Sequence, residues 1–592
     1  MKNTTPPPSR SPTATASPTS IIVNMVSRNE IRTLYLFLHN GDSDTPLRAD
    51  LRVAALEDDP DYEAVSYVWG SSDVLVDIEV SGRNVGVTKN LDTSACINQW
   101  DLKEKAQQQV RQMRHIYSKC RTCLLWMGEI KEDIPQTDAE EALAILKYMA
   151  AVFEAGSDEG IAVPVSLESD ESFRGPLTAL ESLSIEHNPW WARVWTVQEA
   201  VLPQEMTFMW GSLTMPWETM IHATRTWTGT QPDLLMKRFQ VSYKAGLISG
   251  LMAMVVWLGI AKGRSDSPAH LVNRWRFRSA TDPRDKIYAL MGLCLPWTLP
   301  TVEQCDYDMP VVDVFCDLTF DLMLSDESLL PLIMDPRLEA NKATPGIPRW
   351  ALDASHISDR NTDWFHLFAW PEYQAHGGRH LDIGEMLQRR GKTKHRLELK
   401  GVFVSTIKAV GDVWLNPAEP GIDRDAAQRE RIRSCQTLAH EHVKQGTAES
   451  SEPYPGGYTL REAFGRLMLG DIWRNGEQCV EARADEEDVD SVYKFLDTGD
   501  LYWTRQTIWG MMSNQRFFVT ETGLMGIGHM DTQPGEEIWV FHGGNYPFTV
   551  NPRAGSRKDE YEYDFGGRCY VQGVMNGEAF ERGEETRTAT IY

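Results

Sequence analysis

The chain has 592 residues, more than one hydrophobic core usually organises, so roughly two to four domains are expected. Its 42% hydrophobic and 24% charged residues are typical of a soluble globular protein. Acidic residues outnumber basic residues by 84 to 59, and the net charge of -25 argues against nucleic acid or an anionic membrane surface as the partner.

Cysteine usage and the N-terminus give no indication of export or metal binding. Of the 9 cysteines, Cys120 and Cys123 form one close pair, and a single CxxC pair is weak evidence for zinc. Sparse thiols favour a reducing compartment, so a cytoplasmic protein without a metal site is predicted. Residues 1–30 are rich in Pro, Ser and Thr, which predicts a disordered tail rather than a signal peptide.

Five short segments near the start of the chain have the composition of β-strands. Residues 31–38 alternate in part, as in an edge strand, and 51–56 is predicted as a second strand. Segments 74–80 and 83–87 flank a Ser-Gly pair and predict a hairpin. Segment 61–70, with the sequence DYEAVSYVWG, predicts a buried strand that runs into a tight turn. Open α/β sheets place ligands at such strand ends, and a purely structural core strand is the alternative.

Amphipathic helices and a short strand follow. Apolar residues recur at helical spacing from 101 to 117 and again over 139–153, so each segment buries one face. Segment 122–126 is predicted as a short buried strand. The uncharged run 245–261 is slightly short for a membrane span and is interrupted by glycines. We therefore predict a buried core helix there and no membrane span.

Two predicted helices contain acidic residues near their N-termini for which a functional role is one interpretation. Asn188 caps a helix in which Trp195 and Glu199, four residues apart, share one face. Asp282 caps a second helix, predicted over 281–293, and Asp285 lies near the positive end of its dipole. Helix initiation alone explains both aspartates, and a catalytic role is the alternative.

The rest of the chain changes from helical to β-rich. Residues 216–445 are predicted to be mostly helical, and a polar linker covers 446–460. From Arg516 onward, β-rich segments alternate with Gly, Asn and Pro turns, which predicts a small barrel or sandwich within a C-terminal domain over 461–592. Three glycines at 523–528 are interpreted as a turn. The sequence contains no P-loop, nucleophile elbow or HExxH motif, so the common enzyme signatures leave the function open.

A set of short motifs in a fixed order resembles the fungal heterokaryon incompatibility (HET) domain. The motifs are YEAVSYVWG at 62–70, ACINQ at 95–99, QVRQM at 109–113, VWTVQE at 194–199, ATDPRDKIYALMGL at 280–293, PRW at 348–350, RFFVT at 516–520, PGE at 534–536 and GVMNGE at 573–578. One such motif would be weak, whereas the full set in order is specific. The resemblance covers nearly the whole chain after the tail.

The resemblance implies a fungal protein of non-self recognition and programmed cell death. HET domains are thought to be distantly similar to TIR domains, which have a flavodoxin-like α/β fold and in some cases cleave NAD with one glutamate. Trp195 and Glu199 match the Trp-Cys-x-x-Glu spacing of TIR domains, so Glu199 is the candidate catalytic carboxylate, stabilising oxocarbenium charge on the ribose. Ser66, Tyr67, Trp69 and Trp195 would line the pocket, with Trp69 stacked on a base or nicotinamide ring.

Structural roles are the alternative for these residues. Glu199 would then pair with an arginine such as Arg193 or cap a loop, and Trp195 would be a core aromatic. The chain also departs from the family, because Leu91 runs directly into Asp92 where a helix and most of a strand are expected. An unfilled gap in the sheet would cost on the order of several kcal/mol. Repacking, a degenerate domain and a mis-spliced gene each explain the gap, and each lowers the expectation of catalysis.

The expected fold is therefore a flavodoxin/TIR-like α/β domain over 31–215 that lacks a helix and a strand, a helical middle region and a small C-terminal β domain. The first hypothesis for function is a HET-type cell-death protein that acts by self-association or with protein partners, with NAD as a substrate. A non-enzymatic interaction protein, whose N-terminal domain binds another incompatibility factor, is the second hypothesis. An accessory role in a secondary-metabolite gene cluster is the third.

Overall fold

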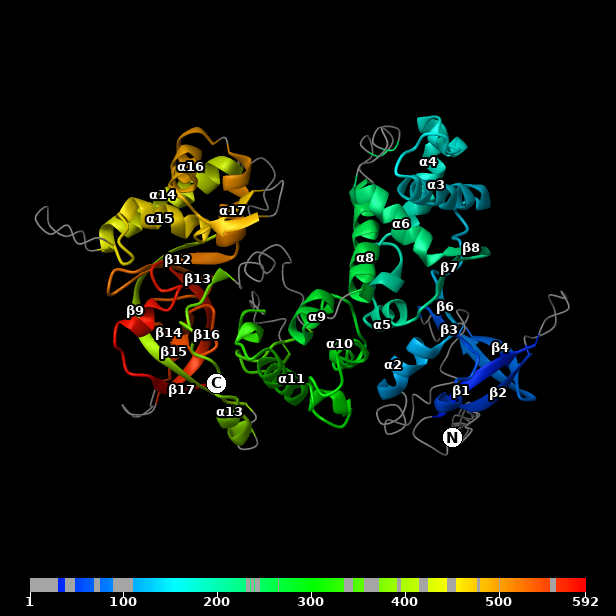
Figure 1. Cartoon of the computed structure of the whole chain (residues 1–592), viewed down its shortest axis with the longest axis horizontal. Coiled ribbons are helices and arrows are strands. Elements are labelled where there is room, and N and C mark those ends of the chain that lie inside the picture. The colour runs from blue at the N-terminus through cyan, green and yellow to red at the C-terminus, as the bar shows by residue number, and fades with distance from the viewer. Residues whose placement is uncertain are drawn as a thin grey trace, which may run out of the picture. The chain divides into compact units, whose positions relative to one another are not determined.

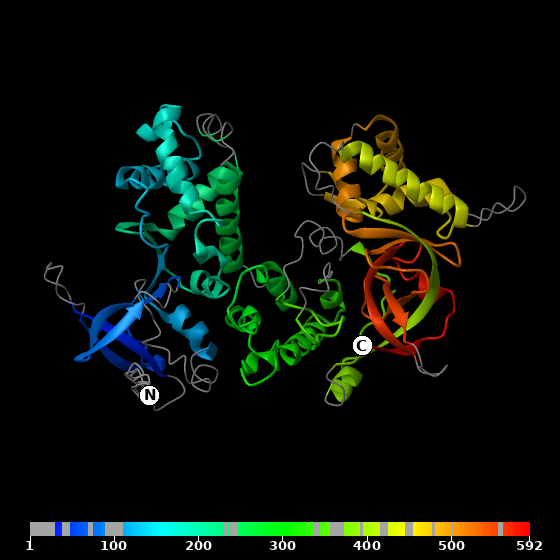
Figure 2. The same cartoon turned by 180° about the vertical axis from the view of Figure 1, so that it is seen from behind.

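A computed structural model gives the fold and describes residues 30–37, 48–68, 75–88, 110–229, 235, 239, 245–263, 266–334, 344–355, 372–390, 395–414, 424–443, 454–475, 480–499, 501–553 and 561–592. The chain divides into two compact units, a first unit over 1–264 and a second unit over 265–592. Figures 1 and 2 show these units from opposite sides. The boundaries predicted at 215 and 445 do not coincide with this division. The predicted tail, except Glu30, lies outside the described residues.

The first unit contains an N-terminal sheet with strand order β1-β2-β4-β5. Its strands are β1 (Glu30–Leu36), β2 (Arg48–Ala55), β4 (Leu75–Val80) and β5 (Arg83–Thr88). The predicted hairpin is confirmed, because β4 and β5 pair antiparallel around Ser81 and Gly82, whose φ angles are 49° and 77°. Two residues with positive φ are what a tight two-residue hairpin turn requires. Strand β1 lies at the edge of the sheet, as predicted.

The second sheet of the first unit has the order β3-β6-β7-β8 and supports the candidate site. Its strands are β3 (Glu63–Ser66), β6 (Thr122–Trp126), β7 (Met206–Trp210) and β8 (Leu213–Pro216). Strands β3, β6 and β7 are parallel, and β8 returns antiparallel. Among the described residues, β3 pairs with a strand only on its β6 side. The predicted bounds of the 122–126 strand are confirmed.

Helices α2 (Val110–Lys119), α3 (Gln136–Ala155), α4 (Asp170–Ser182), α5 (Trp195–Val201), α6 (Trp217–Thr228) and α8 (Ala245–Gly263) complete the first unit. Helix α3 packs against α4 and α6, and α5 contacts α2, β3, β6 and α8. The single helix predicted from Asn188 is wrong: a 3-10 turn over Pro189–Ala192 comes first, and α5 begins at Trp195. Asn188 Oδ1 accepts the Trp190 N–H and so caps that turn rather than a long helix.

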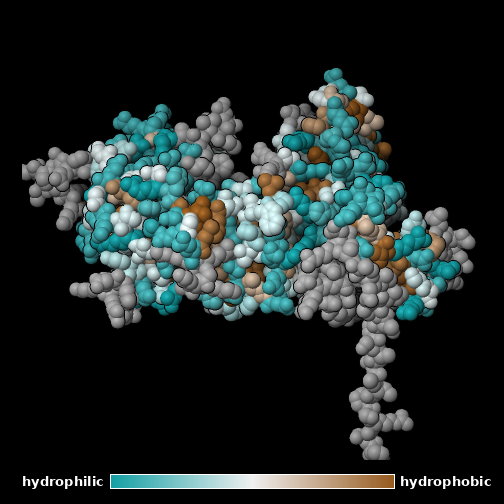
Figure 3. All heavy atoms as spheres, turned by 60° about the horizontal axis from the view of Figure 1, so that its bottom comes forward, coloured by the Kyte–Doolittle hydropathy of each residue, from teal (hydrophilic) through white to brown (hydrophobic). Residues whose placement is uncertain are grey.

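Helix α8 is, within the part of the chain that the structure describes, the one helix long and apolar enough to cross a membrane. It contacts α5 and α6 along one face, where Ile248, Leu251, Met252 and Val255 are buried. This packing is consistent with the predicted core helix. On the face drawn in Figure 3, hydrophilic residues cover most of the described surface, and hydrophobic residues gather in separate small patches.

The second unit begins with helices α9 (Pro268–Trp275), α10 (Asp285–Tyr288) and α11 (Val311–Asp326) and continues through α13 (Ile383–Arg390), α14 (Arg424–His442), α15 (Leu460–Leu469), α16 (Glu486–Thr498) and α17 (Tyr502–Met512), with α18 (Glu578–Glu581) near the C-terminus. The helix predicted over 281–293 is much shorter, because α10 ends at Tyr288 and a 3-10 turn follows at Met291–Leu293. The acidic run at 485–488 begins α16, where the side chains of Asp485 and Asp488 form a capping box.

A closed β-barrel forms the core of the second unit. It contains β9 (Leu397–Val413), β12 (Gln515–Thr520), β13 (Met525–His529), β14 (Glu537–Phe541), β15 (Phe548–Pro552), β16 (Glu562–Val571) and β17 (Arg587–Ile591). The ring closes because the 17-residue strand β9 pairs with β14 on one side and with β12 and β17 along its length. A separate hairpin joins β10 (Ile472–Asn475) to β11 (Val480–Arg483).

Two features of this barrel differ from what the sequence suggests. Strand β9 lies inside the region predicted to be mostly helical, and it is an alternating strand stabilised by partners from the far end of the chain. The turn predicted at the glycines 523–528 is wrong for Gly526 and Gly528, which lie in β13. A Cβ on Gly526 would lie 2.2 Å from the Phe518 ring, so this glycine makes room for an aromatic side chain on the neighbouring strand.

Candidate functional site

Three buried side chains form a hydrogen-bonded chain at the end of β3. The Ser66 hydroxyl donates to Glu199 Oε2 at 2.5 Å, and the Trp190 indole N–H donates to Ser66 Oγ at 2.8 Å. Ser66 and Trp190 are 0% exposed and Glu199 is 6% exposed. Ser66 is the last residue of β3, and Glu199 lies on α5, so residues 133 positions apart in sequence meet at one strand end.

The main chain on both sides of Ser66 is fixed by a second set of contacts. The Arg193 guanidinium donates to the carbonyl oxygen of Tyr67, and the Tyr117 hydroxyl donates to the carbonyl of Val65 at 3.3 Å. Tyr67 itself is buried. Side chains from α2 and from the turn before α5 therefore hold the end of β3, which is a rigid platform for the Ser66 hydroxyl.

The surroundings of Glu199 have low polarity. Burial and the nearby Glu199 carboxylate raise the pKa of Tyr117 and of Cys123 well above their ordinary values. Burial also raises the pKa of Cys120. These groups therefore stay protonated near neutral pH and are not activated nucleophiles. Among the described residues, no group of three His, Cys, Asp or Glu side chains is placed to hold a metal ion.

The structure brings together some of the predicted site residues. Ser66 and Glu199 are in direct contact, and Tyr67 follows at the same strand end. Trp195 is half-buried at the first turn of α5, one turn before Glu199. Trp69 lies outside the described residues. Its predicted stacking role therefore stays a prediction.

Sequence reasoning did not identify Trp190 as a site residue. Trp190 follows a predicted cap, but it lies 124 residues from Ser66 in the sequence, so no local pattern predicts their contact. Gln112 lies on α2, which contacts α5, and it is 6% exposed. Both amide atoms of Gln112 are buried without a hydrogen-bond partner among the described residues. A buried amide without partners is costly, and no contact among the described residues explains it.

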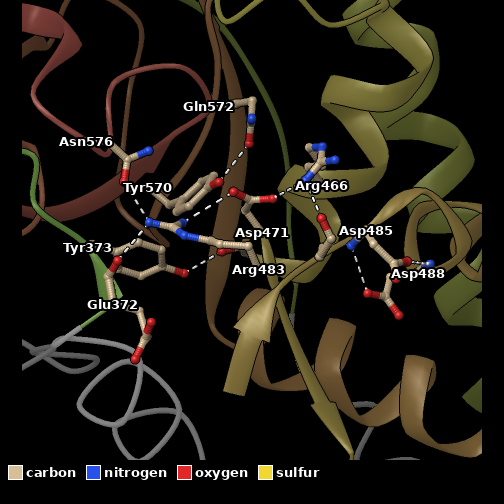
Figure 4. A network of polar contacts seen from close by, with 12 residues as sticks. Glu372, Tyr373, Arg466, Asp471, Arg483, Asp485, Asp488, Tyr570, Gln572 and Asn576 are labelled. Atoms are coloured by element: carbon tan, nitrogen blue, oxygen red, sulfur yellow. Dashed lines mark hydrogen bonds and ion pairs between the residues drawn. The ribbon is translucent and has the colours of Figure 1, made fainter. Parts of the chain in front are cut away.

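The second unit contains a separate network of ion pairs, which Figure 4 shows from close by. Asp471 lies between Arg466 on α15 and Arg483 on β11, at 2.7 and 3.3 Å. Arg483 also donates to the Glu372 carbonyl at 2.7 Å and to Asn576 Oδ1 at 2.6 Å. Burial raises the pKa of Asp471 although both guanidinium groups lower it. The network links a helix, a hairpin and the GVMNGE turn, and its groups are already engaged with one another.

The charged residues of the segment 280–293 also have structural partners. Asp282 pairs with Arg284 at 2.9 Å, and Asp285 accepts a hydrogen bond from the Tyr307 hydroxyl. The Lys286 ammonium donates to the main-chain carbonyls of Arg276, at 2.8 Å, and of Arg278. These contacts explain the charged residues of this motif as groups that stabilise the packing of the second unit. A small cleft in the same unit, lined in part by Phe320, Met386 and His542, contains none of the predicted site residues.

Comparison with known proteins finds one family match in each of the two units. The sequence matches the family described as heterokaryon incompatibility protein (HET) over residues 93–199 and the Het-6 beta-barrel domain over residues 436–588. It is similar to heterokaryon incompatibility protein 6, OR allele, of Neurospora crassa, with 22% identity over 645 residues that cover 90% of this chain and 92% of that protein. No solved structure matches the chain. The chain therefore contains a region that matches the HET family, followed by a region that matches the Het-6 β-barrel domain.

Proposed function

We propose that this protein acts in het-type non-self recognition in a fungus, in the cytoplasm and through contacts with itself or with another incompatibility protein. The observation that carries the proposal is the similarity to heterokaryon incompatibility protein 6, which extends over 90% of this chain and includes both domains in the same order. Because the similarity extends over most of the chain, it supports a role shared by the whole protein and not only by a single common domain.

The HET domain is proposed to have a flavodoxin/TIR-like sheet. The parallel strands β3, β6 and β7, with helices in the connections, support this assignment. On this proposal the strand end at Ser66 corresponds to the ligand-binding edge of the sheet.

NAD cleavage is the proposed activity of that edge. In such a reaction the bond between ribose C1′ and the nicotinamide nitrogen breaks with its electron pair on nitrogen. A water oxygen then bonds to C1′, and one proton of that water is released. The Glu199 carboxylate, buried beside Ser66, would stabilise the positive charge on the ribose. The low polarity around Glu199 would strengthen this interaction.

A non-enzymatic interaction role is the second candidate, and one observation favours it. The Glu199 carboxylate is 6% exposed and already accepts a hydrogen bond from Ser66, as a structural carboxylate does. On this alternative the HET domain triggers death by binding a partner, and Glu199 contributes only to folding.

One experiment separates the two candidates. The wild-type chain, Glu199→Gln and Glu205→Gln are expressed in a fungal host, and viability and NAD content are followed together. Gln keeps the acceptor for Ser66 and removes the charge, whereas Glu205 is an exposed glutamate of the same unit and serves as the matched control. The enzymatic proposal predicts that NAD loss and death disappear only in Glu199→Gln. Death at constant NAD in all three proteins supports the interaction role.

The recognition role has its own test. The same expression is repeated in tester strains that carry different incompatibility alleles. The proposal predicts growth arrest or death in some strains and normal growth in others. Uniform growth in every strain, with the protein folded and present, contradicts a role in non-self recognition.

A further inference from the structure

The hydrogen-bonded chain at the end of β3 runs from Trp190 through Ser66 to Glu199. An indole N–H donates and never accepts, so the Trp190 Nε1 contact of 2.8 Å occupies a lone pair of Ser66 Oγ. The Ser66 hydroxyl in turn donates to Glu199 Oε2, with 2.5 Å between the two oxygens. The two hydrogen bonds therefore link the Trp190 indole to the carboxylate.

We propose that Trp190 is a positioning residue, which acts through Ser66 to orient the Glu199 carboxylate. This inference rests on the proposed NAD cleavage at this site. A carboxylate oriented in this way stabilises positive charge and does not supply a proton. The role fits cleavage of a pyridinium nucleotide, because nicotinamide leaves as a neutral molecule that needs no proton from an acid.

Two ionisable groups, Tyr117 on α2 and Cys123 on β6, lie close to the Glu199 carboxylate and remain protonated. Helix α8 also contacts α5, and its Lys262 donates to the carbonyls of Pro203 and Gln204 at 2.8 and 3.0 Å. The Trp190–Ser66 pair is a hydrogen-bond chain that ends on this carboxylate.

The chain offers a matched control for a test of Trp190. Trp191 is equally buried, its ring centroid lies 4.8 Å from that of Trp190, and its indole donates to the Leu183 carbonyl at 2.8 Å. Trp190→Phe and Trp191→Phe therefore each remove one buried indole hydrogen bond. Only the first of them removes a donor to Ser66.

The first measurement follows nicotinamide release by the purified full chain. Trp190→Phe is expected to lower kcat about tenfold with little change in KM, since one oriented hydrogen bond is worth about that factor. Its pH–rate profile is expected to differ from that of wild type, because the carboxylate then loses the hydrogen bond of an oriented hydroxyl. Trp191→Phe is expected to keep the wild-type profile. Equal profiles for the two variants overturn the proposal.

The second measurement needs no catalysis and separates this inference from the proposed function. Denaturation midpoints are compared for Ser66→Ala, each tryptophan variant and the two double variants. The Trp190→Phe/Ser66→Ala pair is expected to shift the midpoint by clearly less than the sum of its single changes, whereas the Trp191→Phe/Ser66→Ala pair is additive. Additive shifts in both pairs overturn the role of Trp190. If wild type releases no nicotinamide while the coupling is present, the proposed catalysis fails and the positioning of Glu199 stands.

Discussion

At the scale of single residues, the second unit buries ionisable groups outside the candidate site. Lys286 is 6% exposed and donates to two main-chain carbonyls, and its pKa is lowered to about 8 by burial and by Arg276. Glu536, in the PGE motif, is 5% exposed, and burial raises its pKa. Each group is therefore easier to bury in its neutral form, and each makes stability depend on pH.

Lys286 is expected to make the protein more stable as the pH rises above 8. Between the folded pKa of about 8 and the ordinary value of 10.5, the unfolded chain binds more protons, so the free energy of unfolding increases with pH. The full gain is on the order of 3 kcal/mol. Urea unfolding at several pH values between 7.5 and 10 should show this gain in wild type relative to Lys286→Met. A constant difference between the two proteins contradicts it.

Glu536 is expected to have the opposite dependence. Its folded pKa lies above the ordinary value of 4.5, so stability falls as the pH rises through the interval between the two values. Glu536→Gln resembles the protonated side chain and keeps an acceptor for the Gln533 N–H. This variant should be at least as stable as wild type at pH 7, with the advantage shrinking toward pH 4.5. Thermal unfolding across that range measures the difference, and an advantage that grows on acidification would refute the assignment.

At the scale of elements, Asp471 ties the helix α15 to the β10–β11 hairpin. The side chains of Asp471 and Arg466 are 11% and 12% exposed, so removing the shared anion leaves Arg466 as a poorly solvated cation without this partner. Asp471 has a φ of 55°, and asparagine tolerates this left-handed conformation. Replacement by asparagine therefore tests the charge without straining the backbone.

Asp471→Asn is expected to destabilise the protein by on the order of 3 kcal/mol, because removing one member of a buried ion pair leaves the other charge buried and uncompensated. The control is Asp490→Asn, which removes a pair with Arg461 whose side chains are 60% and 56% exposed. That change should cost less than about 1 kcal/mol. Denaturant unfolding of both variants provides the comparison, and equal losses would show that the Asp471 network is not stabilising.

At the scale of the whole molecule, each unit has its own buried core, and the barrel closes entirely within the second unit. Residues 1–264 and 265–592, expressed separately, are each expected to unfold cooperatively, as autonomous domains do. Circular dichroism during heating checks each fragment. A fragment that loses its structure gradually, without a transition, would show that its fold depends on the other unit.

Much of the local structure follows from the sequence. The Ser81-Gly82 hairpin, the strand over Thr122–Trp126 and the amphipathic α3 are set by turn residues and by apolar spacing within a few positions. The ordered motifs were sufficient to recognise the family. Such features are predictable because the interactions that create them connect near neighbours in the chain.

Tertiary structure alone decided the site and the barrel closure. The contact from Ser66 to Glu199 spans 133 residues, and the one from Trp190 to Ser66 spans 124. Residues 397–413 form strand β9 because β14, β12 and β17 supply its hydrogen bonds. Gly526 in β13 makes room for the Phe518 ring on the neighbouring strand. The sequence by itself determined which elements and which family motifs the chain contains. Which side chains meet depends on long-range packing, and the free energy of that packing leaves no periodic signal in the residues that take part.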